Sequence, residues 1–351
     1  MNKEKNILWI NYMKAICIIA VYFVHCTNYY GLYWGNFNRY IETFYVNGFF
    51  FISGYLLFRK QLSEPIINLN SKKYLANDGK FFLRNLFYRI VIPSTLFATL
   101  EFIPSCIIKS REISIDFFLY KTIGGGTYWF TSALVVAELL IFILLLTRNK
   151  NIIFYIVASS IITITGIFLS NNNISIFNDL PSFPWCYKNG MLAITFLTLG
   201  GAYWKLESFI NKIMNKLRLI IMFIIYIVVI FTLSDKAKVL ISLLQLNVLG
   251  IITSLLSILI LVYSIIYFMR TKWSNIEFIG KNSIGFYFLS GAFPIILSSI
   301  FKNVLNIYSS IGLMCIFVMS LFSAYIFVLL TNRYLPYLYD LRKINIKTKK
   351  N

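Results

Sequence analysis

Lys14 and His25 are the two basic residues of the first long apolar run, residues 7–28. They are 11 residues apart, which on an α-helix is about 1100°, or roughly 20° past three full turns. Both side chains therefore project from one helix face, roughly 16 Å apart along the axis. That face would carry a cation near one end and, near the other, an imidazole able to act as a general base or nucleophile. Each residue also has a simpler interpretation: Lys14 can snorkel to the membrane surface, and His25 can be a hydrogen-bonded packing residue.

Four more charged residues lie in or at the ends of apolar runs, where charge is costly and therefore indicates function. Glu42 should lie at the depth of His25, where its carboxylate could orient the imidazole; the alternative is a solvated interfacial acid. Glu138 is in the middle of a run and should face the interior, in either a structural hydrogen bond or a substrate contact. Arg84 and Arg89 are five residues apart and should point in different directions, so that one could face an anionic ligand while the other contacts lipid headgroups. Headgroup contact is the alternative interpretation for either arginine.

The elements that must position these residues are apolar. Of the 351 residues, 58% are hydrophobic and 13% are charged, against roughly 45–50% and 25% in soluble domains. This composition excludes an ordinary soluble domain, a disordered chain and a secreted disulfide scaffold. Long continuous apolar runs predict an all-α integral membrane protein, because barrel strands would be short and alternating.

The sequence predicts a single bundle of about ten transmembrane helices over residues 1–351. The approximate limits of the spans are 7–28, 41–58, 82–104, 128–147, 152–170, 190–204, 217–233, 247–269, 282–300 and 311–331. With the N-terminus inside, the cytoplasmic segments hold 24 Lys and Arg residues and the opposite side holds 8. This bias favours an N-in, C-in topology, with residues 332–351 as a basic cytoplasmic tail.

The net charge of +20 is explained by basic loops, so we expect no nucleic-acid partner. The five cysteines form no CxxC pair and there is one histidine. We therefore expect no metal site and no permanently bound cofactor. The first apolar run is longer than the core of a signal peptide and shows no cleavage site, so we expect a retained helix.

Five motifs occur in order along these runs. They are Lys14-AICIIAVYFV-His25, Phe49-FFISGYLL-Phe58, Arg84-NLFYRIVI-Pro93, Tyr128-WFTSA-Leu134 and Gly280-KNSIGFY-Phe288. From residue 8 to about 290, the pattern resembles the acyltransferase-3 family of bacterial integral membrane acyltransferases. The chain departs from that pattern at Lys14, where the family usually has arginine. It departs also at Tyr128 and Ser290, where the family often has histidine.

The resemblance implies transfer of an acyl group, with acetyl favoured, from cytoplasmic acyl-CoA to a hydroxyl of a cell-surface or exported polysaccharide. It also implies a multi-pass protein of the bacterial cytoplasmic membrane, with acyl-CoA, a sugar acceptor and membrane lipids as partners; a homo-oligomer is left open. The candidate sites are these: His25 and Glu42 for catalysis, Lys14, Arg84 and Arg89 for the phosphates of the donor, and Ser53, Tyr128 and Glu138 for the substrate path.

Two other functions fit the same sequence. A carrier or flippase for a polysaccharide or lipid-linked sugar would also need many spans and intramembrane charge. Such carriers often contain interrupted helices in matching halves of the chain, and none is evident in the sequence. An inactive membrane scaffold is the third interpretation, suggested by the missing family histidines.

Overall fold

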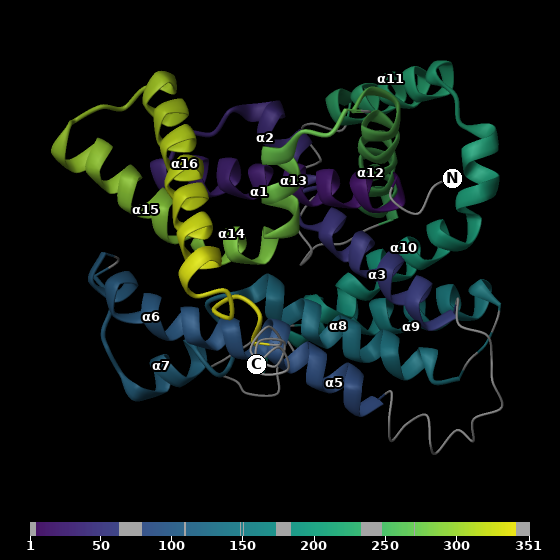
Figure 1. Ribbon diagram of the computed structural model, residues 1–351, viewed down its shortest axis with the longest axis horizontal. Coiled ribbons are helices and arrows are strands. Elements are labelled where there is room, and N and C mark those ends of the chain that lie inside the picture. The colour runs from purple at the N-terminus through teal and green to yellow at the C-terminus, as the bar shows by residue number, and fades with distance from the viewer. Residues whose placement is uncertain are drawn as a thin grey trace. The chain divides into compact units, whose positions relative to one another are not determined.

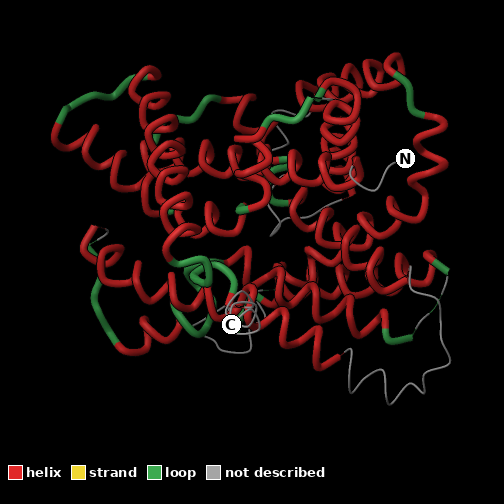
Figure 2. The backbone as a smooth tube through the Cα atoms, viewed as in Figure 1, coloured by secondary structure: helices red, strands yellow, loops and turns green. Residues whose placement is uncertain are grey.

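The computed structural model of the chain describes residues 5–62, 79–108, 110–147, 149, 151–172, 184–232, 248–269 and 271–341. Within these ranges every regular element is a helix, and Figure 2 shows helices joined only by loops and turns. The all-α fold class expected from the long apolar runs is therefore confirmed.

Figure 1 labels most of the helices. In chain order, the elements are α1 (Lys5–Tyr30), α2 (Gly35–Glu42), α3 (Asn47–Leu62), α5 (Lys80–Leu86), the π-helical turn η2 (Phe87–Val91), α6 (Ile92–Ile108), α7 (Ile115–Lys121), α8 (Trp129–Leu145), α9 (Ile152–Asn171), α10 (Tyr187–Ile213), α11 (Lys216–Thr232), α12 (Val248–Phe268), α13 (Ser274–Lys281), α14 (Ser283–Leu289), α15 (Ala292–Ser299), the π-helical turn η5 (Ile300–Val304) and α16 (Ser310–Tyr334).

Within the described ranges, seven helical segments are long and apolar enough to cross a membrane. They are Leu8–Tyr30, Gly35–Leu62, Lys80–Ile108, Ile152–Ser170, Gly250–Phe268, Ser283–Val304 and Ser310–Tyr334. Helices α10 and α11 pass the same test as a pair bent by 113°, and the apolar helix α8 is shorter, at 17 residues. Each expected span overlaps one of these helices, and the exact number of ten stays a prediction. Three parts of these predictions lie outside the described residues. They are residue 233, the last of one expected span, residue 247, the first of another, and residues 342–351 of the expected tail.

The second expected span, 41–58, begins earlier in the structure, at Gly35. The reason is Asn38, which is fully buried although it is polar. Its side-chain Nδ2 donates to Thr27 Oγ1 at 2.8 Å, and its Oδ1 accepts from the backbone N–H of Trp34 at 3.0 Å. Helix α2 is thereby fixed to α1 through hydrogen bonds, which a hydropathy pattern does not predict.

Two of the apolar runs contain a proline close to a departure from regular α-helix. Pro93 has no N–H to donate to the Arg89 carbonyl, and the chain passes through η2, where the N–H of Ile92 bonds to Phe87 O instead. Such π turns often occur at functional sites. In the ninth expected span, Pro294 leaves the Ser290 carbonyl without its helical donor. The run accordingly divides into α14 and α15.

The chain forms two compact units. Unit 1 comprises Met1–Ile52 and Leu206–Leu330, and unit 2 comprises Ser53–Lys205 and Thr331–Asn351. Each unit is built from segments distant in sequence, so neither is a continuous stretch of chain. The single transmembrane domain expected over residues 1–351 stays a prediction.

Helix α1 is the central helix of unit 1. It packs most extensively against α13 and α15 and also contacts α12, α14 and α2. Helix α13 approaches α1 closely at Gly280, where a Cβ would collide with the backbone oxygen of Asn11. Glycine at this position therefore lets the two helices pack backbone against backbone.

Glycines also set the spacing of helices in unit 2. A Cβ at Gly54 of α3 would collide with the backbone of Leu197 in α10, and a Cβ at Gly201 would collide with the ring of Phe58. Helices α3 and α10 therefore pack closely at two positions along their length. Helix α7, which the hydropathy pattern does not predict, packs against α6.

Candidate functional site

The Lys14–His25 face lies on an uninterrupted helix. Helix α1 runs from Lys5 to Tyr30 without a break, so the 11-residue spacing places both side chains on one face as expected. Both residues are half-buried, whereas most of their neighbours on α1 are fully buried. The helix therefore presents two ionisable side chains along its less covered face.

The imidazole of His25 packs against Tyr29, one helical turn further along α1. The ring centroids are 5.8 Å apart with an interplanar angle of 67°, an edge-on arrangement. The Nδ1 atom of His25 is buried. Packing of this kind limits rotation of the imidazole and favours a defined orientation.

Glu42, the expected partner of His25, bonds elsewhere. It ends α2, and its Oε2 accepts a hydrogen bond from the Tyr33 hydroxyl at 3.4 Å. Burial and the charge of Glu42 raise the pKa of Tyr33 to about 12. Tyr33 is therefore a neutral donor near pH 7, and the expected carboxylate–imidazole pair is not formed in this structure. The catalytic assignment of Glu42 stays a prediction.

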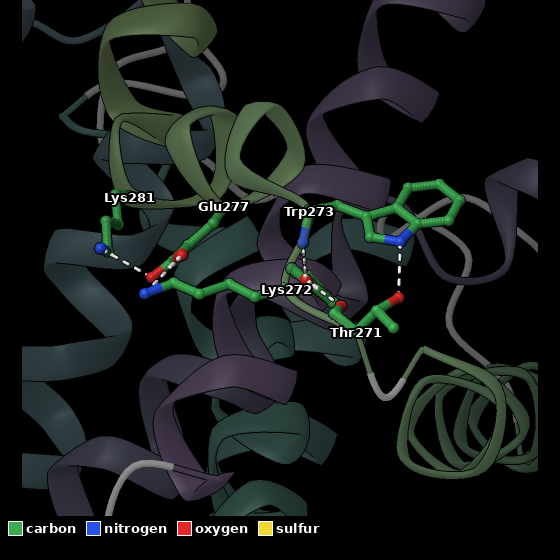
Figure 3. Close-up of polar contacts among 6 residues, drawn as sticks. Thr271, Lys272, Trp273, Glu277 and Lys281 are labelled. Atoms are coloured by element: carbon green, nitrogen blue, oxygen red, sulfur yellow. Dashed lines mark hydrogen bonds and ion pairs between the residues drawn. The ribbon is translucent and has the colours of Figure 1, made fainter.

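A polar cluster joins Tyr12 of α1 to the segment that enters α13. Figure 3 labels Thr271 and Trp273 of that segment. The Tyr12 hydroxyl donates to Thr271 O at 2.9 Å and accepts from the backbone N–H of Trp273 at 2.7 Å. The indole Nε1–H of Trp273 in turn donates to Thr271 Oγ1 at 2.8 Å. These bonds fix the segment that enters α13 against α1. Asn11, which meets Gly280, is one turn from Lys14 on the same helix.

The carboxylate of Glu277 lies between two lysines, which converge on it in Figure 3. Lys281 Nζ is 2.7 Å from Oε1 and Lys272 Nζ is 3.7 Å from Oε2. The hydrogen bond from Lys281 and the two positive charges hold the pKa of Glu277 below its usual range. One acid is shared by two cations, so the cluster keeps a net positive charge.

In unit 2, Arg89 and Glu138 form an ion pair. Arg89 Nη2 is 3.3 Å from both carboxylate oxygens of Glu138. The Glu138 side chain is 7% exposed and that of Arg89 is 41% exposed. The expectation that Glu138 faces the interior is confirmed. Arg84 is exposed and, within the described part of the chain, has no ion-pair partner, so the two arginines differ in environment as expected.

The two remaining path candidates also lie in unit 2. Ser53 is half-buried on α3, next to the close contact at Gly54. Tyr128 is buried and immediately precedes α8, where its carbonyl accepts hydrogen bonds from the hydroxyls of Thr131 and Ser132. Tyr128 thus anchors the start of the helix that carries Glu138.

The expected site residues divide between the two units. Lys14, His25 and Glu42 belong to unit 1, whereas the other five belong to unit 2. The structure pairs Arg89 with Glu138 but does not pair Glu42 with His25. It also adds residues that the sequence analysis did not name as site candidates, namely Tyr29 beside His25 and the two lysines around Glu277.

A family model described as an acyltransferase domain matches residues 7–333, nearly the whole chain. The chain belongs to the acyltransferase-3 family. No curated protein and no solved structure matches it. The family identifies the protein as an acyltransferase, and its apolar helices identify it as a multi-pass membrane protein.

Several residues of the five family motifs have a role that the structure shows. Lys14 and His25 share a face of the central helix of unit 1, and Arg89 of the third motif is paired with a buried acid. The glycines of two motifs have packing roles, at Gly54 and Gly280. Lys281, next to Gly280, could have been singled out from its motif, whereas nothing in the sequence connects Tyr29 or Lys272 with the site.

Proposed function

We propose that this acyltransferase moves an acyl group, acetyl in the first instance, from cytoplasmic acyl-CoA to a hydroxyl of an exported or cell-surface glycan. The observation that carries the proposal is the face of α1 that bears both Lys14 and His25, in a chain matched by the family over residues 7–333. A cation at one end suits an anionic donor. An imidazole at the other end suits activation of a hydroxyl.

In the proposed reaction, His25 accepts the proton of the sugar hydroxyl as its oxygen attacks the thioester carbonyl. The carbon–sulfur bond then breaks, and CoA leaves as a thiolate that takes up the proton. A positioned base of this kind typically contributes 10²–10⁴-fold. A two-step route through an acyl-histidine gives the same products, and both routes require His25. Glu42, on the helix that Asn38 fixes to α1, is proposed as the second catalytic residue.

The phosphates of acyl-CoA are proposed to bind Lys14, Arg84 and Arg89. Arg84 supports this role because it is exposed and has no ion-pair partner within the described part of the chain. Arg89 already shares its charge with Glu138, so its contribution to donor binding should be smaller. Ser53, Tyr128 and Glu138 are proposed to line the substrate path.

We further propose ten spans in a single transmembrane domain with both termini in the cytoplasm of a bacterium. The distribution of basic residues supports this topology, with 24 on the side of the termini and 8 on the other. The residues near His25 would then face the outside, where an exported glycan is located. The lipids of the cytoplasmic membrane would surround the helices.

A carrier or flippase for a glycan is the second candidate. The observation that favours it is the 113° bend between α10 and α11, because carriers build binding sites from interrupted helices. The break, however, is flanked by Lys212, Lys216 and Arg218. Basic residues are typical of a cytoplasmic loop between two spans. The bend is therefore equally well explained by such a loop between the sixth and seventh spans proposed for the acyltransferase.

A reconstitution experiment tests the proposal. The purified protein in lipid nanodiscs is given radiolabelled acetyl-CoA and a de-acetylated surface glycan. We expect release of free CoA thiol that depends on the glycan, with the label recovered on the glycan as an alkali-labile ester. Glycan movement across proteoliposomes without any release of CoA would support the carrier and contradict the acyltransferase.

A further inference from the structure

Lys302 of η5 has an unusual environment at the His25 end of α1. Its side chain is half-buried, and Nζ donates a hydrogen bond to Tyr29 O at 3.3 Å. The same ammonium lies 5.9 Å from the ring centroid of Tyr30 and 5.7 Å from that of Tyr308. The positive charge is therefore held between two aromatic rings and the end of α1.

The groups around this ammonium are fixed before any ligand binds. Tyr308 donates its hydroxyl to Gly31 O at 2.6 Å. Tyr30 donates to Ile307 O at 2.6 Å and accepts from the backbone N–H of Ser309 at 3.0 Å. Gly31 has a φ of +74°, which allows the tight turn that places its carbonyl beside Tyr308.

The positive charge of Lys302 is not neutralised within the described part of unit 1. An ammonium has three N–H donors, of which the Tyr29 carbonyl takes one. No carboxylate of the described residues lies within ion-pair distance of Nζ, and Glu42 bonds to Tyr33. Carbonyls and aromatic rings attract a cation but carry no net charge. The remaining donors can therefore bind an anion.

This cation is connected to the proposed catalytic histidine through one residue. The Tyr29 ring packs against His25 at 5.8 Å, and the Tyr29 carbonyl holds Lys302. Tyr308 is 58% exposed, whereas Tyr30 is fully buried. The cluster thus offers an exposed aromatic face and a positive charge on the same end of α1 as His25.

We propose that Lys302 and Tyr308 form an acceptor subsite that binds the carboxylate of an acidic sugar. This inference rests on the proposed function, because it specifies the class of glycan that is acylated. The ammonium pairs with the carboxylate, and the exposed ring of Tyr308 packs against the sugar ring. A hydroxyl of the same or a neighbouring sugar can then reach His25.

A phosphate of a lipid headgroup is the other source of an anion at this position. A lysine that serves lipids extends away from the protein to the membrane surface. Lys302 instead folds back onto α1, with Nζ at the carbonyl of Tyr29 and near the ring of buried Tyr30. This conformation favours a ligand bound at the protein over a surrounding headgroup.

Equilibrium binding to the full chain in phosphatidylcholine nanodiscs tests the subsite without requiring acyl transfer. The probes are fluorescent trigalacturonate and the neutral trisaccharide made by reducing its carboxyl groups. We expect the acidic probe to bind about tenfold more tightly, an effect of one charged hydrogen-bonded pair. High salt should remove this preference in the unchanged protein. Equal binding of the two probes would overturn the subsite even if no variant folds.

Three variants locate the charge. Lys302→Gln should abolish the preference for the acidic probe, and Lys302→Arg should retain most of it. Lys121→Gln is the matched control, because Lys121 Nζ also donates to a carbonyl, that of Gly126, and lies over two rings, but in unit 2. The control should keep the full preference. An equal loss in Lys121→Gln would indicate a general electrostatic effect and overturn the proposal.

Two further measurements separate the remaining outcomes. In the first, binding of the acidic probe is measured in nanodiscs that also contain phosphatidylglycerol. If this anionic lipid displaces the probe, and if the displacement depends on Lys302, the site belongs to lipid headgroups and the proposal is overturned. Acyl transfer is measured in the same preparations. Transfer with no preference for acid would overturn the subsite alone, whereas a preference that depends on Lys302 without any transfer would overturn the proposed function alone.

Discussion

Arg89 Nη2 lies 3.3 Å from both carboxylate oxygens of Glu138, an ion pair that joins the third family motif to α8, the helix that begins within the fourth motif. The pair is asymmetric, since the acid is buried and the arginine is partly exposed. Arg89 also belongs to η2, the π turn ahead of Pro93. The pair therefore links a buried charge to an irregular turn of helix.

The asymmetry predicts unequal effects of removing each partner. Arg89→Gln removes the cation that lies 3.3 Å from a buried carboxylate and should destabilise the protein by about 1–3 kcal/mol. Glu138→Gln leaves an arginine that water or headgroups can reach and should cost less than about 1 kcal/mol. Thermal unfolding in detergent, followed by size-exclusion chromatography, measures both. The double variant should recover part of the loss, and equal effects of the two single changes would contradict the asymmetry.

The lysines around Glu277 predict a dependence of stability on pH. The folded-state pKa of Glu277 lies below the unfolded value of 4.5. Its contribution is therefore present above pH 4.5 and is lost as the pH falls through the folded-state pKa. Thermal stability measured between pH 3 and 7 should show a smaller acid-side loss in Lys281→Gln than in the unchanged protein. An identical acid-side loss in both proteins would show that Lys281 does not lower this pKa.

The approach of α13 to α1 predicts that Gly280 tolerates no side chain. Gly280→Ala would place a Cβ against the backbone oxygen of Asn11, and overpacking of this kind costs about 1–3 kcal/mol. Gly79→Ala is a suitable control, because its Cβ would lie 3.9 Å from the Phe142 ring, an ordinary contact. Melting temperature and membrane yield should fall for the first variant and stay near normal for the second. Equal melting temperatures would contradict this packing.

The sequence predicts those features of the site that depend on one helix at a time. The apolar run around Lys14 and His25 is long enough to give one straight helix, and their spacing then places both on one face. Glu138 lies in the middle of an apolar run, so its burial follows from the cost of exposing a charge to lipid. Such features need only the helical period and the hydropathy of a segment.

The partners of these residues depend on contacts between distant segments and could not be predicted. The sequence suggests that Glu42 meets His25 across a hairpin, but α2 ends at Glu42 and brings Tyr33 to its carboxylate. Lys302 and Tyr29 are 273 positions apart in the chain, so no local pattern connects them. The pairing of Arg89 with Glu138 likewise requires the packing of α8 against η2.

The most direct measurement of the central claim is the ester content of the surface glycan in a His25→Ala strain. Cys26→Ser, a neighbouring buried position on α1, is the matched control, and both variants are first shown to reach the membrane. We expect normal glycan with acyl esters reduced at least about 100-fold in His25→Ala and in a gene deletion, and unchanged in Cys26→Ser. Lost surface glycan in the deletion, with unchanged acyl content per sugar in whatever remains, would contradict the acyltransferase and favour a carrier.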